Sequence, residues 1–185
     1  MALTTIFRAK TWAWLPLLLL AGCCANNVCN CAGEAQEDAV QLVFDPRSYT
    51  AADLDTLVLQ RYPKIKKTKV KPDVVTIVRP AGPASSSYTI VLNNSTPFPQ
   101  QGTTKLNGYS YQVRFLNHSA GQRPNAALAL AIDSVQLRGS LDGNGCCTCY
   151  TNSYKALYLR TRKDSSATTN ALVVLAKDSV YVIKR

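Results

Sequence analysis

From residue 40 onward, the chain consists of short apolar or alternating runs that are separated by turn residues. In the segment 109–115, hydrophobic and polar positions alternate, which places Tyr109, Tyr111, Val113 and Phe115 on one face of an extended strand. Valine, isoleucine, threonine and tyrosine dominate the runs, and these residues favour β-structure. The pattern predicts nine strands, over residues 40–44, 56–62, 74–79, 88–93, 108–116, 128–141, 154–162, 171–176 and 179–184.

Between the predicted strands, polar and glycine-containing segments indicate tight turns. Lys177-Asp178 lies between the last two strands and predicts a hairpin. Residues 142–145 read Asp-Gly-Asn-Gly and predict a second turn, directly before a cluster of cysteines. One helical turn is expected over residues 51–54, with Thr50 as its N-cap.

Nine strands with no helices between them imply antiparallel pairing, because parallel strands need long crossover connections. We therefore expect an all-β fold, a single antiparallel β-sandwich that is immunoglobulin-like, over residues 40–185. A closed β-barrel with an interior cavity is the alternative. The 185 residues, of which 46% are apolar, suffice for one packed domain and exclude a disordered chain.

The first 22 residues have the organisation of a secretory signal peptide. Arg8 and Lys10 give the start a positive charge with no acid, and residues 12–22 are apolar. That apolar stretch is too short to cross a hydrocarbon core of about 30 Å, and Pro16 interrupts it. We expect residues 1–22 to be removed on export, which lowers the formal charge from +10 to +8 because Arg8 and Lys10 are lost.

The residues around the expected cleavage point carry a more specific motif. Leu20-Ala21-Gly22-Cys23 consists of a branched apolar residue, two small residues and a cysteine. The motif resembles the lipobox of bacterial lipoproteins. This resemblance implies cleavage between Gly22 and Cys23, a diacylglyceryl group on the Cys23 thiol and a further acyl chain on the new amino terminus. Two or three acyl chains make membrane attachment effectively permanent. In the alternative, an ordinary signal peptidase cuts nearby and Cys23 is an ordinary thiol.

The residues after Cys23 indicate which membrane holds the chain and on which side. Cys24 rather than aspartate follows the anchor, which resembles lipoproteins passed on to the outer membrane. The neutral Ala25-Asn26-Asn27 lacks the acidic cluster that surface-exported lipoproteins often carry, so we expect the chain to face the periplasm. The segments 49–56, 61–63 and 146–150 also resemble parts of small, uncharacterised β-rich lipoproteins of Bacteroidota, a group that implies no activity.

Six cysteines remain when Cys23 carries the lipid, and they form two clusters: Cys24, Cys29 and Cys31, then Cys146, Cys147 and Cys149. An exported chain reaches an oxidising compartment, so clustered cysteines predict disulfides. In an extended segment, residues two apart share a face. The pairs 29/31 and 147/149 are therefore expected to bridge the clusters and to fix the tether, residues 23–39, to the domain. In the alternative, the thiols bind zinc or copper or act in redox chemistry, although their spacing does not match the common motifs.

A basic patch is predicted within residues 64–71, where five lysines lie between two prolines: Lys64, Lys66, Lys67, Lys69 and Lys71. Such a run protects an edge strand against aggregation, or it contacts lipid phosphates or another polyanion. We discount nucleic acid as the partner, because an exported and membrane-tethered chain seldom meets any.

No motif for catalysis or for a cofactor is found. His118 is the only histidine, the acidic residues are scattered, and no glycine-rich phosphate loop occurs. We therefore expect no catalytic residue, no cofactor and no metal. The sequence predicts a non-catalytic binding or structural module of the envelope that is held by its lipid and contacts an envelope protein or a glycan. A metal- or thiol-handling protein is the alternative.

Overall fold

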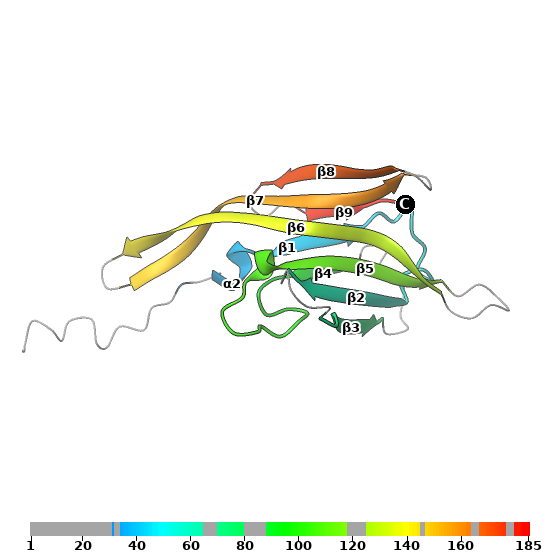
Figure 1. Cartoon of the computed structure of the whole chain (residues 1–185), viewed down its shortest axis with the longest axis horizontal. Coiled ribbons are helices and arrows are strands. Elements are labelled where there is room, and N and C mark those ends of the chain that lie inside the picture. Colours follow the sequence, from blue (N-terminus) through cyan, green and yellow to red (C-terminus); the bar gives the residue numbers. More distant parts are fainter. Residues whose placement is uncertain are drawn as a thin grey trace, which may run out of the picture.

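The computed structural model describes residue 31 and residues 34–64, 70–79, 88–117, 125–144, 147–163, 167–176 and 180–185. These residues form two β-sheets, with the strand orders β4-β1-β9 and β3-β2-β5-β6-β7-β8 (Figure 1). Two short helices accompany them, α2 (Glu34–Glu37) and the 3-10 helix η1 (Leu106–Gly108). The strands are β1 (Val40–Phe44), β2 (Thr56–Pro63), β3 (Asp73–Val78), β4 (Thr89–Leu92), β5 (Tyr109–Asn117), β6 (Asn125–Asn144), β7 (Cys147–Lys163), β8 (Ala167–Leu175) and β9 (Val180–Ile183).

The predicted β-sandwich is confirmed. The larger sheet ends in two edge strands, β3 and β8, so the barrel alternative is wrong. Of the strand pairings within the described residues, six are antiparallel, and β1 and β9 run parallel. A parallel pair needs a long connection, and the whole chain between residues 44 and 180 supplies it here.

The core lies between the two sheets and follows the alternation of the sequence. On β1, the side chains of Val40, Leu42 and Phe44 are fully buried. On β5, the four residues that were predicted to share one face are all buried. Full burial of a large apolar side chain contributes about 1.5–3 kcal/mol, so this shared layer is the main source of the fold's stability.

The β6–β7 hairpin is the longest feature of the fold and extends well beyond the smaller sheet (Figure 1). Three bulge residues interrupt the pairing of its strands. Ala129 interrupts the pairing of β6 with β5, and Asp133 and Ser153 interrupt the pairing of β6 with β7. Bulges bend a strand and increase its twist, which lets this long hairpin curve over the core. The turn predicted over residues 142–145 is wrong for residues 142–144, because these pair with β7 as far as Asn144, which lies opposite Cys147. Residue 145 lies outside the described residues.

The predicted hairpin of the last two strands is wrong. β8 pairs with β7 at the edge of the larger sheet, whereas β9 pairs with β1 in the smaller sheet. Leu175 of β8 and Ile183 of β9 are both buried in the same core. The two strands therefore contribute to one core from opposite layers.

At residues 51–54, where one helical turn was predicted, the structure has a hydrogen-bonded turn that Thr50 caps. Thr50 Oγ1 accepts a hydrogen bond from the Asp53 amide at 3.3 Å, and Asp53 Oδ2 accepts one from the Thr50 amide at 2.9 Å. This reciprocal pair is a capping box, here closed by an aspartate. It fixes the position of the Asp53 carboxylate, which matters for the site described below.

The short helix α2 was not predicted, and it lies in the segment that was expected to be a tether. Its contacts with β7 hold it in place. Glu37 Oε2 accepts a hydrogen bond from the Asn152 amide at 3.0 Å, and Asp38 Oδ1 accepts one from the Tyr150 hydroxyl at 3.0 Å. A helix of four residues is not stable alone, so tertiary contacts rather than local sequence determine it.

Candidate functional site

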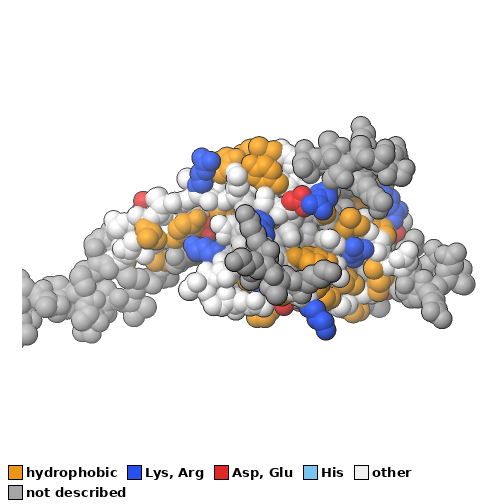
Figure 2. All heavy atoms as spheres, in the orientation of Figure 1, with side chains coloured by type: hydrophobic (Ala, Val, Ile, Leu, Met, Phe, Trp, Pro, Cys, Tyr) orange, Lys and Arg blue, Asp and Glu red, His pale blue; other side chains and the backbone are white. Residues whose placement is uncertain are grey.

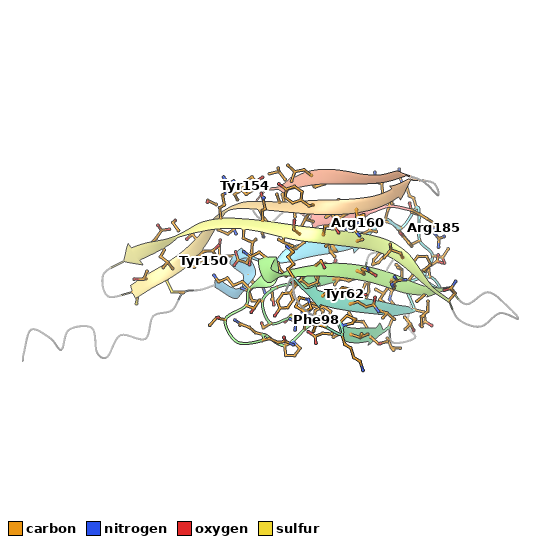
Figure 3. The ribbon with its side chains drawn as sticks, in the orientation of Figure 1. Tyr62, Phe98, Tyr150, Tyr154, Arg160 and Arg185 are labelled. Atoms are coloured by element: carbon orange, nitrogen blue, oxygen red, sulfur yellow. A yellow bond between two sulfur atoms is a disulfide. The ribbon has the colours of Figure 1, made fainter. Side chains whose placement is uncertain are left out.

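A disulfide fixes the start of the described chain to one end of the molecule. Cys31 is bonded to Cys149 with an S–S distance of 1.96 Å, and the two are 118 residues apart in sequence. Cys149 lies near the start of β7, beside the Tyr150 that contacts α2, and Figure 3 shows Tyr150 at the opposite end from Arg185. The chain therefore enters the fold at the tip of the β6–β7 hairpin.

This bond agrees with the prediction that the two cysteine clusters are bridged. Cys147 is disulfide-bonded as well, whereas Cys23, Cys24, Cys29 and Cys146 lie outside the described residues. The three described cysteines thus have no free thiol in this oxidation state. Within the described ranges, no group of three or more histidine, cysteine or acidic side chains is placed to hold a metal.

Several other predicted site residues also lie outside the described part of the chain: Gly22, Lys66, Lys67 and Lys69. The single histidine of the sequence, His118, lies outside it as well. Of the basic patch, Lys64 and Lys71 are described. Lys64 Nζ donates a hydrogen bond to the Asn107 carbonyl at 3.1 Å. Burial lowers the pKa of Lys64, and the charge of Asp133 acts in the opposite direction. The structure therefore gives Lys64 a role in holding η1, which directly precedes β5.

At the other end of the sandwich, a cavity of about 360 Å³ opens between β9 and the β6–β7 part of the larger sheet. Most of its wall is apolar, and three cations belong to its lining: Arg160, Lys184 and Arg185. Figure 3 shows Arg160 and Arg185 on this side of the molecule. The remaining lining residues are Tyr49, Phe115, Leu128, Ala129, Leu130, Ala131, Leu159, Tyr181 and Ile183.

Two bulges of β6 shape the cavity. Ala129 is the extra residue of the first bulge and lies in the cavity wall. Asp133 is the extra residue of the second bulge, where it forms a two-point ion pair with Arg160, with N–O distances of 2.9 and 3.1 Å. The Arg160 side chain remains 57% exposed, so its guanidinium is held in place and still faces solvent. Bulges commonly redirect side chains in this way beside functional sites.

Arg185 is held from three directions. Its Nη2 lies 3.0 Å from Asp53 Oδ1, the carboxylate that the capping box positions. Its guanidinium lies 5.2 Å from the ring centre of Tyr49 and 5.1 Å from that of Phe115, within range of a cation–π interaction. The Tyr49 ring in turn packs edge-on against Phe115 at 5.6 Å. The cation is therefore placed over an aromatic wall.

The titratable groups of the site divide into neutral phenols and charged pairs. Burial raises the pKa of both Tyr49 and Tyr181, so both are neutral at ordinary pH. Burial alone would raise the pKa of Asp53, but the hydrogen bonds from Thr50 and the charge of Arg185 outweigh it and leave that pKa below its usual value. Asp133 and Asp53 thus each pair with one arginine of the cavity lining, and Lys184 is the third cation there.

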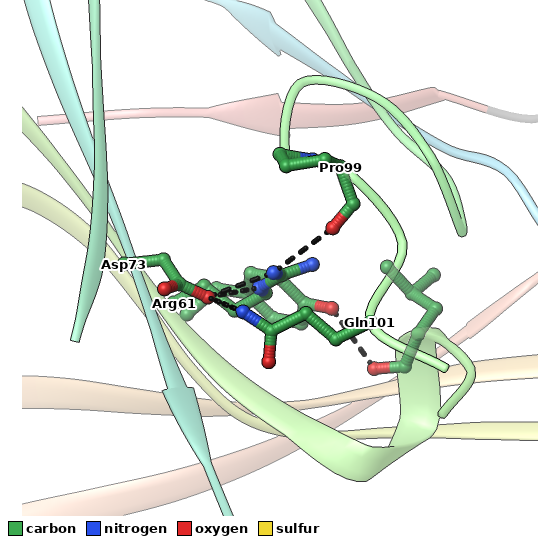
Figure 4. Close-up of polar contacts among 6 residues, drawn as sticks. Arg61, Asp73, Pro99 and Gln101 are labelled. Atoms are coloured by element: carbon green, nitrogen blue, oxygen red, sulfur yellow. Dashed lines mark hydrogen bonds and ion pairs between the residues drawn. The ribbon is translucent and has the colours of Figure 1, made fainter. Parts of the chain in front are cut away.

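A second cluster of charge and aromatic rings surrounds Arg61, whose side chain is only 3% exposed. Its Nη2 lies 2.7 Å from Asp73 Oδ2 and donates to the Pro99 carbonyl at 3.1 Å (Figure 4). The guanidinium lies between the rings of Phe98 and Tyr109, 4.8 and 4.4 Å from their centres. Arg61 thus contacts Asp73 on β3 and Tyr109 on β5 as well as Phe98 and Pro99 of the loop before η1, so this cluster fastens that loop to the sheet.

The outer face of the larger sheet is mixed in character. Figure 2 shows basic side chains scattered over it and hydrophobic side chains gathered over β8. The exposed apolar residues of β8 are Leu172 and Val174.

Comparisons with protein-family models, curated proteins and solved structures find no match to this chain. Within the described residues, no helix has the length and apolar character to cross a membrane. The function is therefore argued from the chain's own residues.

None of the cavity residues was singled out from the sequence as a site residue. They come from segments far apart in the chain, and the parallel pairing of β9 with β1 is what brings Tyr181, Ile183 and Arg185 opposite β6 and β7. The one local signal was Thr50-x-x-Asp53, the capping box that fixes Asp53. Its link to Arg185 is tertiary and has no counterpart in the sequence pattern.

Proposed function

We propose that this chain is a lipid-anchored lipoprotein of the bacterial envelope and that its β-sandwich is a non-catalytic binding module. The single observation that carries the proposal is the Cys31–Cys149 disulfide. Cys31 follows the proposed lipid-bearing Cys23 by eight residues. An extended chain covers about 3.5 Å per residue, so the disulfide holds the hairpin tip within about 28 Å of the anchor.

This arrangement gives the domain an orientation relative to the membrane. The hairpin tip with Cys149 is the end nearest the lipid, and the cavity with Arg160 and Arg185 lies at the other end of the molecule (Figure 3). The cavity then opens away from the leaflet, toward the compartment that holds the partner. Since Cys24 follows Cys23, we place the anchor in the outer membrane and the domain in the periplasm.

The composition of the cavity favours binding over catalysis. Its lining contains no serine, cysteine, histidine or acidic side chain among the described positions, so neither a serine nor a cysteine nucleophile with an adjacent histidine or carboxylate faces it. The two arginines are held by carboxylates and rings. An apolar wall with a few fixed polar groups is the usual form of a site that recognises a ligand.

The test is to express the full chain in a Gram-negative host that is fed an alkyne-labelled palmitate. We expect the wild type and the matched control Cys24→Ala to carry the label and to partition into detergent. Cys23→Ala should lose the label, because its thiol is the proposed acceptor. A wild-type protein without label and recovered in the aqueous phase would overturn the proposal.

A further inference from the structure

We infer that the cavity between β9 and the β6–β7 part of the larger sheet binds a neutral carbonyl compound, such as a ketone, ester or amide, with a compact apolar body. The hydroxyls of Tyr49 and Tyr181 donate hydrogen bonds to its carbonyl oxygen, and the apolar body lies against Leu130 and Leu159. The inference rests on the proposed function only in taking the domain to be a binding module. It adds the class of ligand and the groups that recognise it.

The cavity lies where the smaller sheet ends. β9 is an edge strand of that sheet, and Tyr181 and Ile183 lie on the same face of β9, in the cavity wall. The lining on β6 includes the small side chains of Ala129 and Ala131, which leave space. The volume of about 360 Å³ is at the lower end of the range of about 300–1,000 Å³ that ligand pockets occupy, so the apolar body has to be compact.

The wall contains a buried hydroxyl without a hydrogen-bond partner. Tyr49 is only 5% exposed, and no hydrogen bond engages its hydroxyl in the part of the chain that the structure describes. By contrast, Tyr111 is 4% exposed, and its hydroxyl donates to the Leu106 carbonyl at 3.0 Å. Among the described residues, no fully enclosed side-chain nitrogen or oxygen lacks a partner, so the Tyr49 hydroxyl borders open space. Because Tyr49 lines the cavity, a ligand there can supply the missing hydrogen bond.

Tyr181 supplies a second hydroxyl. It is half-buried, and within the described residues no hydrogen bond engages its hydroxyl either. Burial raises the pKa of both phenols, and the neighbouring Tyr181 adds to the rise in the pKa of Tyr49, which indicates that the two lie close together. Both therefore stay protonated and are donors at ordinary pH. A carbonyl oxygen has two lone pairs, so it can accept a hydrogen bond from each.

The charges at the mouth of the cavity favour a neutral ligand. Arg160 pairs with Asp133, and Arg185 pairs with Asp53. The third cation of the lining, Lys184, is offset by the main-chain carboxylate of Arg185, the last residue of the sequence. An ionised ligand would therefore lose its hydration in the cavity without an unpaired charge among the described residues to replace it.

The test uses the full chain with isotope-labelled tyrosine in a non-ionic detergent, and binding is followed by nuclear magnetic resonance. The variants Tyr49→Phe and Tyr181→Phe assign the two ring signals. The ligands are benzylacetone, its carboxylate isostere hydrocinnamate and its oxygen-free isostere isopentylbenzene, each titrated against the free concentration measured by dialysis. We expect benzylacetone to shift both signals saturably and to bind about tenfold tighter than hydrocinnamate, because the carboxylate loses more hydration.

Variants separate the hydrogen bond from the apolar contact. Tyr49→Phe should weaken benzylacetone binding about three- to tenfold, the scale of one hydrogen bond, with the Tyr181 signal as the readout. The same variant should leave the binding of isopentylbenzene unchanged, because that ligand has no acceptor. The matched control Tyr154→Phe removes a hydroxyl outside the cavity and should leave the binding of both ligands unchanged.

An equal effect of Tyr49→Phe on the two neutral ligands, or hydrocinnamate binding as tight as that of benzylacetone, would overturn the inference. So would the absence of a saturable shift with benzylacetone. These outcomes do not depend on whether Cys23 carries a lipid. Failure of the ligand class is therefore distinguished from failure of the proposed anchoring, which the palmitate label measures.

Discussion

Asp73 is the ion-pair partner of a buried arginine, Arg61, and is itself 38% exposed. The two members of the pair therefore differ in what they lose when the other is removed. Without Arg61, the Asp73 carboxylate is free to hydrate. Without Asp73, the Arg61 charge stays enclosed between Phe98 and Tyr109 and lacks a counter-ion.

We therefore predict that Asp73→Asn lowers the free energy of unfolding by about 3 kcal/mol, the usual cost of leaving a buried charge unpaired. The matched control is Asp133→Asn, whose partner Arg160 is 57% exposed. That substitution should cost less than about 1 kcal/mol, as expected for an exposed ion pair. Urea unfolding followed by circular dichroism measures both. Equal losses in the two variants would contradict the burial argument.

The Cys31–Cys149 disulfide gives a second prediction. Closing a loop of this length restricts the unfolded chain, so the double variant Cys31→Ser/Cys149→Ser should lose about 2–5 kcal/mol of unfolding free energy. The double variant avoids the unpaired thiol that either single variant would leave for exchange with the disulfide of Cys147. Unfolding without reductant provides the measurement. A double variant as stable as the wild type would show that the bond does not hold the fold.

The sequence predicted the fold class, but it did not predict which strands pair across long distances in the sequence. Alternation on β5 placed four side chains in the core because a strand exposes every second residue to one layer. The position of β9 was not predictable in this way. Its pattern fits a hairpin with β8 or a parallel partner equally, and only packing against the core decides between them.

The candidate site was likewise predicted only in part. The bridging of the cysteine clusters was predictable, because residues two apart in a strand share a face and Cys31 and Cys149 were members of the two expected pairs. The cavity was not, because Tyr49, Arg160 and Arg185 converge only after β9 joins the smaller sheet. The short helix α2 was missed for the same physical reason: its contacts with β7 are long-range.

The capping box of Thr50 and Asp53 leads to a prediction about pH. The pKa of Asp53 is lower in the fold than its ordinary value of 3.8, so its stabilising contribution is present above pH 3.8 and is lost as the pH falls through the lower folded value. Asp53→Asn should therefore lower the free energy of unfolding by about 1 kcal/mol at pH 7. The difference from wild type should shrink below pH 3.8.

Urea unfolding at pH 7 and at pH 3 tests this dependence. The control is Asp142→Asn, an exposed carboxylate near the hairpin tip, which should behave like the wild type at both values. A constant difference between Asp53→Asn and wild type at the two pH values would exclude a role for the carboxylate charge.

The last prediction concerns orientation on the membrane and uses two exposed apolar residues at opposite ends of the molecule. Leu141 is 68% exposed near the tip of the β6–β7 hairpin, and Val182 is 40% exposed on β9 beside the cavity. Because the disulfide holds the tip close to the anchor, a photo-crosslinking amino acid at 141 should capture phospholipid in intact cells. The same group at 182 should capture little, since β9 lies at the far end. Mass spectrometry of the adducts provides the readout, and equal lipid capture at both positions would show that the domain lies flat on the leaflet.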